Sequence, residues 1–107
     1  MATSKTYLQY VQDQTAGLDV RCRPMMGEYV LYYRDRVAGG LYDNCLMVKD
    51  VPAARALMPE ATPQPPYPGA RPMLAVDRLD DRAFLEALFE DMYAQLPPPA
   101  QKRRKRA

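Results

Sequence analysis

The sequence predicts an α+β fold in which an antiparallel sheet of about five strands packs in two layers with an N-terminal and a C-terminal helix. The first observation is the segment 21–49, where short runs rich in Tyr, Val and Leu alternate with turn residues. The links between these runs are too short for crossovers, so neighbouring strands should pair antiparallel. The second observation is that apolar residues on both sides of this segment recur at helical spacing.

The first predicted element is a helix over about residues 4–16. Thr3 or Ser4 can serve as its N-cap, and Gly17 suits a C-terminal stop. The apolar side chains near helical spacing are Tyr7, Leu8, Tyr10, Val11 and Leu18. We expect one face of this helix to pack on the sheet.

Four strands are predicted in succession, separated by turn residues. They are expected at 19–23, 28–34, 37–42 and 45–49. Alternation in the second strand should send its tyrosines to both faces of the sheet, so they cannot form one stacking platform.

Two glycines interrupt the third predicted strand. Gly39 and Gly40 lie side by side there, and a glycine inside a strand indicates a bulge or a close backbone approach.

The segment after the meander is expected to hold a short helix, a proline-rich connection and one more strand. Asp50 can cap a helix that has Pro52 in its first turn. Six prolines from Pro59 to Pro72 then exclude a helix or a central strand and favour an ordered, extended chain. The apolar run 73–76 is long enough for the fifth strand.

The last predicted helix has the strongest pattern in the sequence. Asp80 is a candidate N-cap, and Leu79 can contact Phe84 as a hydrophobic staple. The apolar stripe is formed by Phe84, Leu85, Leu88, Phe89, Met92 and Leu96. Three prolines starting at Pro97 end the helix.

Composition and charge divide the chain into one domain and a tail. We expect a folded domain over residues 1–97 and a disordered basic tail over 98–107. The tail carries five of the 15 basic residues, so 10 basic and 13 acidic residues leave the domain with a net charge of −3. The sequence has neither a long apolar run nor a signal-peptide pattern, so we expect a cytoplasmic protein without membrane contact.

The residue inventory favours a protein that is not an enzyme. The sequence has no histidine, which removes His-based triads and His metal ligands. Cys22 and Cys45 are expected to be small buried hydrophobic residues, and Asp80 and Asp81 are explained by helix capping. We therefore expect no catalytic residue, no metal and no cofactor.

Several segments together resemble the N-terminal domain of the TfoX/Sxy family. They are RPMMGEY at 23–29, LYY at 31–33, GGLYD at 39–43, LMVK at 46–49 and PPYPGA at 65–70. In order and spacing they are similar to the family pattern over roughly residues 4–97. The resemblance implies a compact α+β domain from a bacterial regulator of natural competence. It implies a non-enzymatic regulatory module that acts in transcription through protein partners.

The most unusual local signal is the turn that contains Pro24, Met25, Met26 and Gly27. Two adjacent methionines can offer an adaptable apolar surface to a protein partner. The structural interpretation, which we favour, is that one methionine fills the core while Gly27 supplies a turn conformation, with a positive φ or a close backbone contact.

Two arginines share one face of the first predicted strand. Arg21 and Arg23 can bind a phosphate or a carboxylate, but a solvated face or pairing with acids such as Glu28 is the more common outcome. A small enzyme or ligand binder that uses this face and the proline-rich loop is the weakest of the functional hypotheses.

The tail provides the alternative function. Its cations are Lys102, Arg103, Arg104, Lys105 and Arg106. They can bind nucleic acid through phosphates, weakly and without base specificity, or they can simply keep the chain in solution. An exposed strand edge can also pair two copies as a homodimer, so the oligomeric state stays open.

Overall fold

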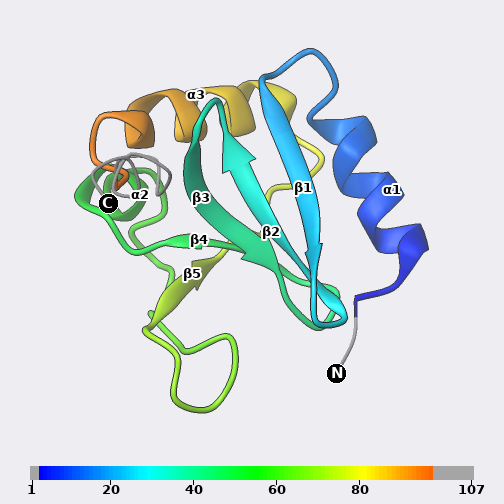
Figure 1. The fold of residues 1–107 in the computed structure, drawn as a ribbon. Coiled ribbons are helices and arrows are strands. Elements are labelled where there is room, and N and C mark those ends of the chain that lie inside the picture. The colour runs from blue at the N-terminus through cyan, green and yellow to red at the C-terminus, as the bar shows by residue number, and fades with distance from the viewer. Residues whose placement is uncertain (1–2, 98–107) are drawn as a thin grey trace, which may run out of the picture.

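The structure is a computed structural model that describes residues 3–97 of the 107. The elements in chain order are α1 (Lys5–Gln14), β1 (Val20–Met25), β2 (Glu28–Tyr33), β3 (Arg36–Leu41), β4 (Leu46–Lys49), α2 (Pro52–Leu57), β5 (Met73–Ala75) and α3 (Arg82–Tyr93) (Figure 1). The predicted α+β fold with a helix near each end of a five-stranded sheet is confirmed. The tail 98–107, predicted to be disordered, lies outside the described residues.

The five strands form one antiparallel sheet in the order β1-β2-β3-β4-β5. The first four strands are a meander, as predicted from the short links. The fifth strand returns after α2 and the proline-rich segment to pair with β4. Its outer side is met by Gln64, which exchanges two backbone hydrogen bonds with Met73. The two edges of the sheet are therefore β1 and β5.

A bulge in β3 shifts its register against β2. Leu31 is opposite Gly39, but Tyr32 is opposite Val37, so Ala38 is an extra residue with no partner on β2. This agrees with the irregularity that the adjacent glycines predicted. Beyond the bulge, Arg36 lies opposite Tyr33 and shares its face of the sheet.

One face of the sheet, called here the covered face, packs against the helices. Its buried strand residues are Leu31, Tyr33, Leu41, Leu46, Val48 and Leu74. They form a single core with Val11 of α1, Ala54 of α2 and the apolar stripe of α3. Because side chains alternate along each strand, the residues between them lie on the opposite face, called here the open face. The architecture is therefore two-layered, with the helices on one side of the sheet.

The helix ends confirm one predicted cap and correct two. Ser4 caps α1, because its hydroxyl accepts a hydrogen bond from the Tyr7 amide. The cap of α3 is Asp81 rather than Asp80: a turn from Arg78 brings the Asp81 carboxylate within 3.0 Å of the Phe84 amide.

Asp50 does not cap α2. Its carboxylate forms an ion pair with Arg55, and the residue at the N-cap position of α2 is Val51, which makes no side-chain cap bond. Within residues 3–97, no helix is long and apolar enough to cross a membrane.

Candidate functional site

The turn between β1 and β2 presents an apolar side chain to solvent in a conformation that this residue type avoids. Met25 is opposite Glu28, so Met26 and Gly27 form a two-residue loop. Their φ angles are 52° and 88°, the pattern of a type I′ hairpin turn. The positive φ predicted at Gly27 is confirmed. Met26 is 97% exposed and Met25 is 39% exposed, so the prediction that one methionine fills the core is wrong.

The core has no place for either methionine, for a geometric reason. Alternation along β1 turns Val20 and Cys22 toward the covered face and Met25 toward the open face. Met26 stands at the tip of the hairpin, beyond the last strand pair. We call the exposed pair Met25 and Met26 the hairpin tip.

Arg21 and Arg23 lie on the open face of β1, and both are exposed. The Arg21 guanidinium donates to the Arg34 carbonyl at 3.3 Å. The exposure of both arginines agrees with the predicted solvated face, and neither forms an ion pair with Glu28 within residues 3–97. The Glu28 carboxylate instead accepts from the Thr3 hydroxyl at 2.7 Å and from the Asp43 amide.

Pro24 lies between these arginines and the hairpin tip, on the edge strand β1. A proline has no amide to donate, so it is tolerated on an edge strand and interrupts the hydrogen-bonding pattern that a further strand would need. This position works against strand-to-strand pairing of two copies along β1.

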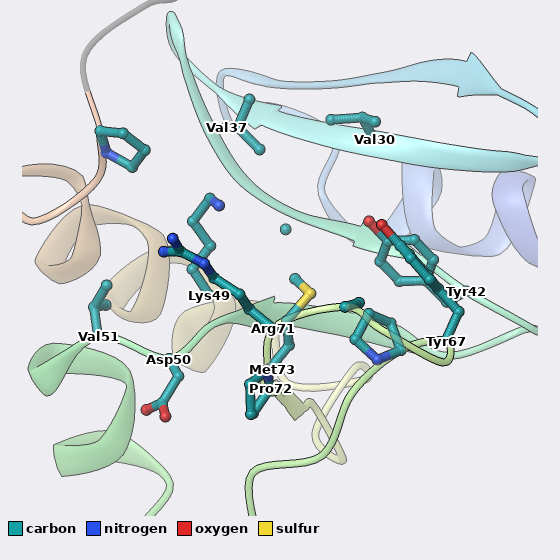
Figure 2. Close-up of a pocket in the computed structure, with 14 residues that line it drawn as sticks. Val30, Val37, Tyr42, Lys49, Asp50, Val51, Tyr67, Arg71, Pro72 and Met73 are labelled. Atoms are coloured by element: carbon teal, nitrogen blue, oxygen red, sulfur yellow. The ribbon is translucent and has the colours of Figure 1, made fainter.

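A second feature of the open face is a pocket of about 480 Å³ between the sheet and the proline-rich segment (Figure 2). Val30 and Val37 line it from β2 and β3, and Lys49 lines it from β4. The opposite wall comes from the segment before β5 and includes Tyr67 and Arg71. The pocket therefore joins two parts of the chain that are far apart in the sequence.

The aromatic wall of the pocket depends on a glycine. A Cβ atom on Gly40 would lie 2.8 Å from the Tyr42 ring, so the ring packs directly over the bare backbone. The Tyr42 and Tyr67 rings are 5.9 Å apart between centroids and inclined by 55°. Burial raises the pKa of the Tyr42 hydroxyl, and the neighbouring Tyr67 and Glu28 raise it further, so this hydroxyl keeps its proton at neutral pH.

The cations of the pocket have no anionic partner among residues 3–97. The structure gives the Lys49 and Arg71 side chains neither a hydrogen bond nor an ion pair within this range. The nearby carboxylate of Asp50 is already bound by Arg55. In Figure 2, Lys49 and Arg71 extend their charged ends toward the same part of the pocket.

The two thiols are poorly suited to nucleophilic chemistry. Cys22 and Cys45 are free and half-buried. Burial raises the pKa of both thiols, and the carboxylates of Asp77 and Asp43 raise that of Cys45 further. Both are therefore protonated at neutral pH.

The hairpin tip was predictable from the sequence, but most of the pocket was not. The proline-rich loop was expected to act with the Arg21/Arg23 face, whereas the structure places Lys49 and Arg71 in the pocket. Two signals were present in the sequence: the adjacent glycines at 39 and 40, and the lone aromatic Tyr67 among prolines.

Comparison with known proteins finds one relative whose length closely matches this chain. It is an uncharacterised 12.7 kDa protein in the trpE 5′ region of Spirochaeta aurantia. The two sequences are 35% identical over 107 residues, which cover 98% of this chain and 93% of the relative. No family model matches the chain. No solved structure matches it significantly.

Proposed function

We propose that this chain, which belongs to the same protein family as the Spirochaeta aurantia 12.7 kDa protein, is a non-enzymatic interaction module that acts through a protein partner. The resemblance to the TfoX/Sxy N-terminal domain suggests a partner from the transcription machinery or its regulators. The observation that carries the proposal is Met26, an apolar residue that is 97% exposed and has a φ of 52°.

Arg34 shows how the fold stabilises another residue with a positive φ. Arg34 also has a positive φ, of 58°, but its side chain is held by an ion pair with Glu90 and lies over the rings of Tyr33 and Tyr93. Those contacts offset an unfavourable backbone conformation. Met26 has the same unfavourable backbone, but its side chain is almost fully exposed, so no contact of this side chain within residues 3–97 offsets that conformation.

A residue whose side chain has no internal contact to compensate for a disfavoured backbone conformation supports a contact outside the chain. Methionine is suited to such a contact, because its flexible, polarisable side chain adapts to irregular apolar surfaces. The adjacent Met25, 39% exposed, extends the apolar tip, and Arg23 adds a positive charge on the same side of β1.

Site-specific photo-crosslinking in cells tests the proposal. A benzoylphenylalanine in place of Met26 should give one discrete adduct with a transcription-related protein. The same group in place of Glu86, an exposed residue of α3, should give none. The purified partner should bind the wild-type chain and should bind Met26→Asn at least tenfold more weakly. Equal crosslinking from both positions, or full binding by Met26→Asn, would overturn the assignment of the hairpin tip.

The open face supports a second candidate, binding of single-stranded nucleic acid. Arg21 and Arg23 lie on this face, and Lys49 and Arg71 line its pocket. Together with the predicted contacts of the basic tail, these cations can neutralise backbone phosphates. Tyr67, which is 52% exposed, offers a ring for a base to stack on. Fluorescence anisotropy with a single-stranded oligonucleotide, titrated with the full chain and with residues 1–97, separates the contributions of the tail and of the open face.

A further inference from the structure

We propose that the open-face pocket is a binding site for a small molecule that joins a planar ring to an anionic phosphate or carboxylate group. This inference is independent of the proposed protein partner, because none of the residues of the hairpin tip lines the pocket. It rests on the charge, the aromatic wall and the preformed shape of this part of the fold.

The anionic group is assigned to Lys49 and Arg71. Both side chains line the pocket and have no ion pair within residues 3–97. Two unpaired cations beside one cavity repel each other, and a bound anion removes that repulsion while gaining charge-assisted hydrogen bonds. The Arg71 fork suits the paired oxygens of a phosphate or a carboxylate, and Lys49 adds a point charge.

The backbone fixes the positions from which the Lys49 and Arg71 side chains extend. Val48 is buried in the core, so alternation along β4 directs Lys49 to the open face. Pro72 follows Arg71, and a proline restricts the residue before it to an extended backbone. Two backbone hydrogen bonds between Gln64 and Met73, the first residue of β5, hold the proline-rich segment against the sheet. The cationic side of the pocket is therefore largely preformed.

The ring is assigned to the aromatic side of the pocket. Tyr42 is held over Gly40, and Tyr67 stands beside it with 52% of its surface exposed. The inclination of 55° between the two rings means that they do not cover each other as a parallel stack would. A planar ligand ring can therefore pack on Tyr67, while Val30 and Val37 supply an apolar floor (Figure 2).

The dimensions favour a small molecule over a polymer. A volume of about 480 Å³ falls within the roughly 300–1,000 Å³ of ordinary ligand pockets. Arg21 and Arg23, the other cations of the open face, are not part of the lining. A ligand that satisfies Lys49 and Arg71 does not need them.

A panel of compounds tests whether ring and anion are both required. Adenosine 5′-monophosphate and 4-hydroxybenzoate carry both parts, with a phosphate and a carboxylate respectively. For the first compound, adenosine carries only the ring and ribose 5-phosphate only the anion; for the second, phenol and acetate are the matched partial compounds. We expect at least one of the two full compounds to raise the melting temperature of the full chain and to bind at least tenfold more tightly than either of its own partial compounds. Because the two differ in both ring and anion, the one that binds identifies the combination of ring and anion that fits the pocket.

Substitutions of pocket residues test whether the active compound binds in this pocket. Arg71→Gln and Lys49→Met should each weaken the active compound at least tenfold, and Tyr67→Ala should reduce its advantage over the partial compound that lacks the ring. Arg23→Gln is the matched control, because Arg23 is an exposed arginine of the same face outside the pocket. NMR shift changes on ligand addition should concentrate at 66–73 and around Lys49.

Three results would overturn the inference. They are the failure of both ring–anion compounds to bind, binding that Arg71→Gln and Lys49→Met leave unchanged, and equal affinity of the partial compounds. Binding of a single-stranded oligonucleotide while both small compounds fail would also overturn it, in favour of the nucleic-acid function.

Discussion

Tyr33 of β2 stacks on Phe89 of α3, with ring centroids 5.5 Å apart and an angle of 15° between the ring planes. The Tyr33 hydroxyl also donates a short hydrogen bond to Glu90, the next residue of the helix. One side chain therefore links the sheet to α3 through both an apolar and a polar contact. Because the Glu90 carboxylate accepts this hydrogen bond, the polar contact requires the protonated Tyr33 hydroxyl.

The first prediction is that the free energy of unfolding falls at alkaline pH. Burial raises the pKa of Tyr33 above its ordinary value of 10.0, and the hydrogen bond to Glu90 and the charge of Glu90 raise it further. Burial also raises the pKa values of Tyr7 and Tyr42, and those of the thiols of Cys22 and Cys45 above 9.0. A folded-state pKa that is raised gives stability that is fully present below the unfolded value and is lost as the pH rises through the folded value.

Urea unfolding from pH 7 to 11.5 measures this effect. The titration of these groups should leave the stability flat up to about pH 9 and lower it steeply above about pH 10, with tyrosinate absorbance rising together with unfolding. Tyr33→Phe should make the decline shallower. A stability curve that stays flat through pH 11 would contradict the buried, protonated state of these side chains.

The second prediction is that two substitutions in the turn between β1 and β2 change the stability of the domain in opposite directions. Met26→Asn should stabilise the domain by about 1 kcal/mol, because asparagine tolerates the left-handed conformation that methionine avoids. Gly27→Val should destabilise it by about 1 kcal/mol or more, because valine is strained at a φ of 88°. Chemical denaturation of both variants provides the measurement. A neutral result for both would mean that the turn relaxes freely.

The third prediction tests the packing of α3. Leu88 is fully buried in the core. Leu88→Asp should unfold the domain, because it places a charge among apolar side chains, and Leu88→Ala should cost about 2–5 kcal/mol. Glu86→Ala, at an exposed position of the same helix, should change the stability by less than about 0.5 kcal/mol. Circular dichroism during thermal unfolding would detect the difference, and equal melting temperatures would rule out this orientation of the helix.

The fourth prediction separates steric conflict from backbone strain at two glycines. A Cβ on Gly39 would lie 2.0 Å from the Met47 carbonyl oxygen, which belongs to the neighbouring strand. Gly39→Ala should therefore cost about 3 kcal/mol or more, since relief requires the separation of β3 and β4. Gly69→Ala meets no atom within 4 Å but has a φ of +89°, so it should cost only about 1 kcal/mol. Similar losses at both sites would argue against the close strand contact.

The fifth prediction concerns nucleic acid. Any affinity for duplex DNA should reside almost wholly in residues 102–106, because the rest of the chain has a net charge of −3. Five cations neutralise at most five phosphates, so the slope of log affinity against log salt should be no steeper than about −4.5. Binding should also be insensitive to sequence.

Fluorescence anisotropy with the full chain and with residues 1–97 tests this prediction. Removal of residues 98–107 should abolish duplex binding and leave the melting temperature unchanged. If the truncated chain still binds DNA with sequence preference, the assignment of DNA binding to the tail is wrong. Arg21→Gln and Arg23→Gln would then test whether the open face of β1 binds the DNA.

The sequence was sufficient for the elements that depend on local patterns. The apolar stripe of α3 repeats at helical spacing and is buried, and the turn residues correctly separate β1 to β4. One error was a local choice between two near-equal neighbours. Asp80 and Asp81 are chemically identical, and only the turn from Arg78 decides that Asp81 reaches the Phe84 amide.

The pocket could not be derived in the same way, because it depends on contacts that local patterns do not encode. Lys49 and Arg71 belong to different segments, and only the pairing of β4 with β5 brings these segments together. The position of Met26 was predicted wrongly for a different reason. Hydrophobicity favours a buried position for Met26, but a two-residue turn leaves its side chain nowhere to be buried.

The extra residue in β3 marks a place where the chain can change in length. The bulge at Ala38 puts Arg36 on the face of Tyr33, and the Arg36 guanidinium donates to the carbonyls of Tyr93 and Leu96 at the end of α3. Deletion of Ala38 would remove the bulge but keep Gly39 opposite Leu31 and Val37 opposite Tyr32, so Arg36 would keep its face and its two acceptors. The fold would lose only the buried methyl group of Ala38. A one-residue gap at position 38 of a sequence alignment is therefore compatible with the same junction between sheet and helix.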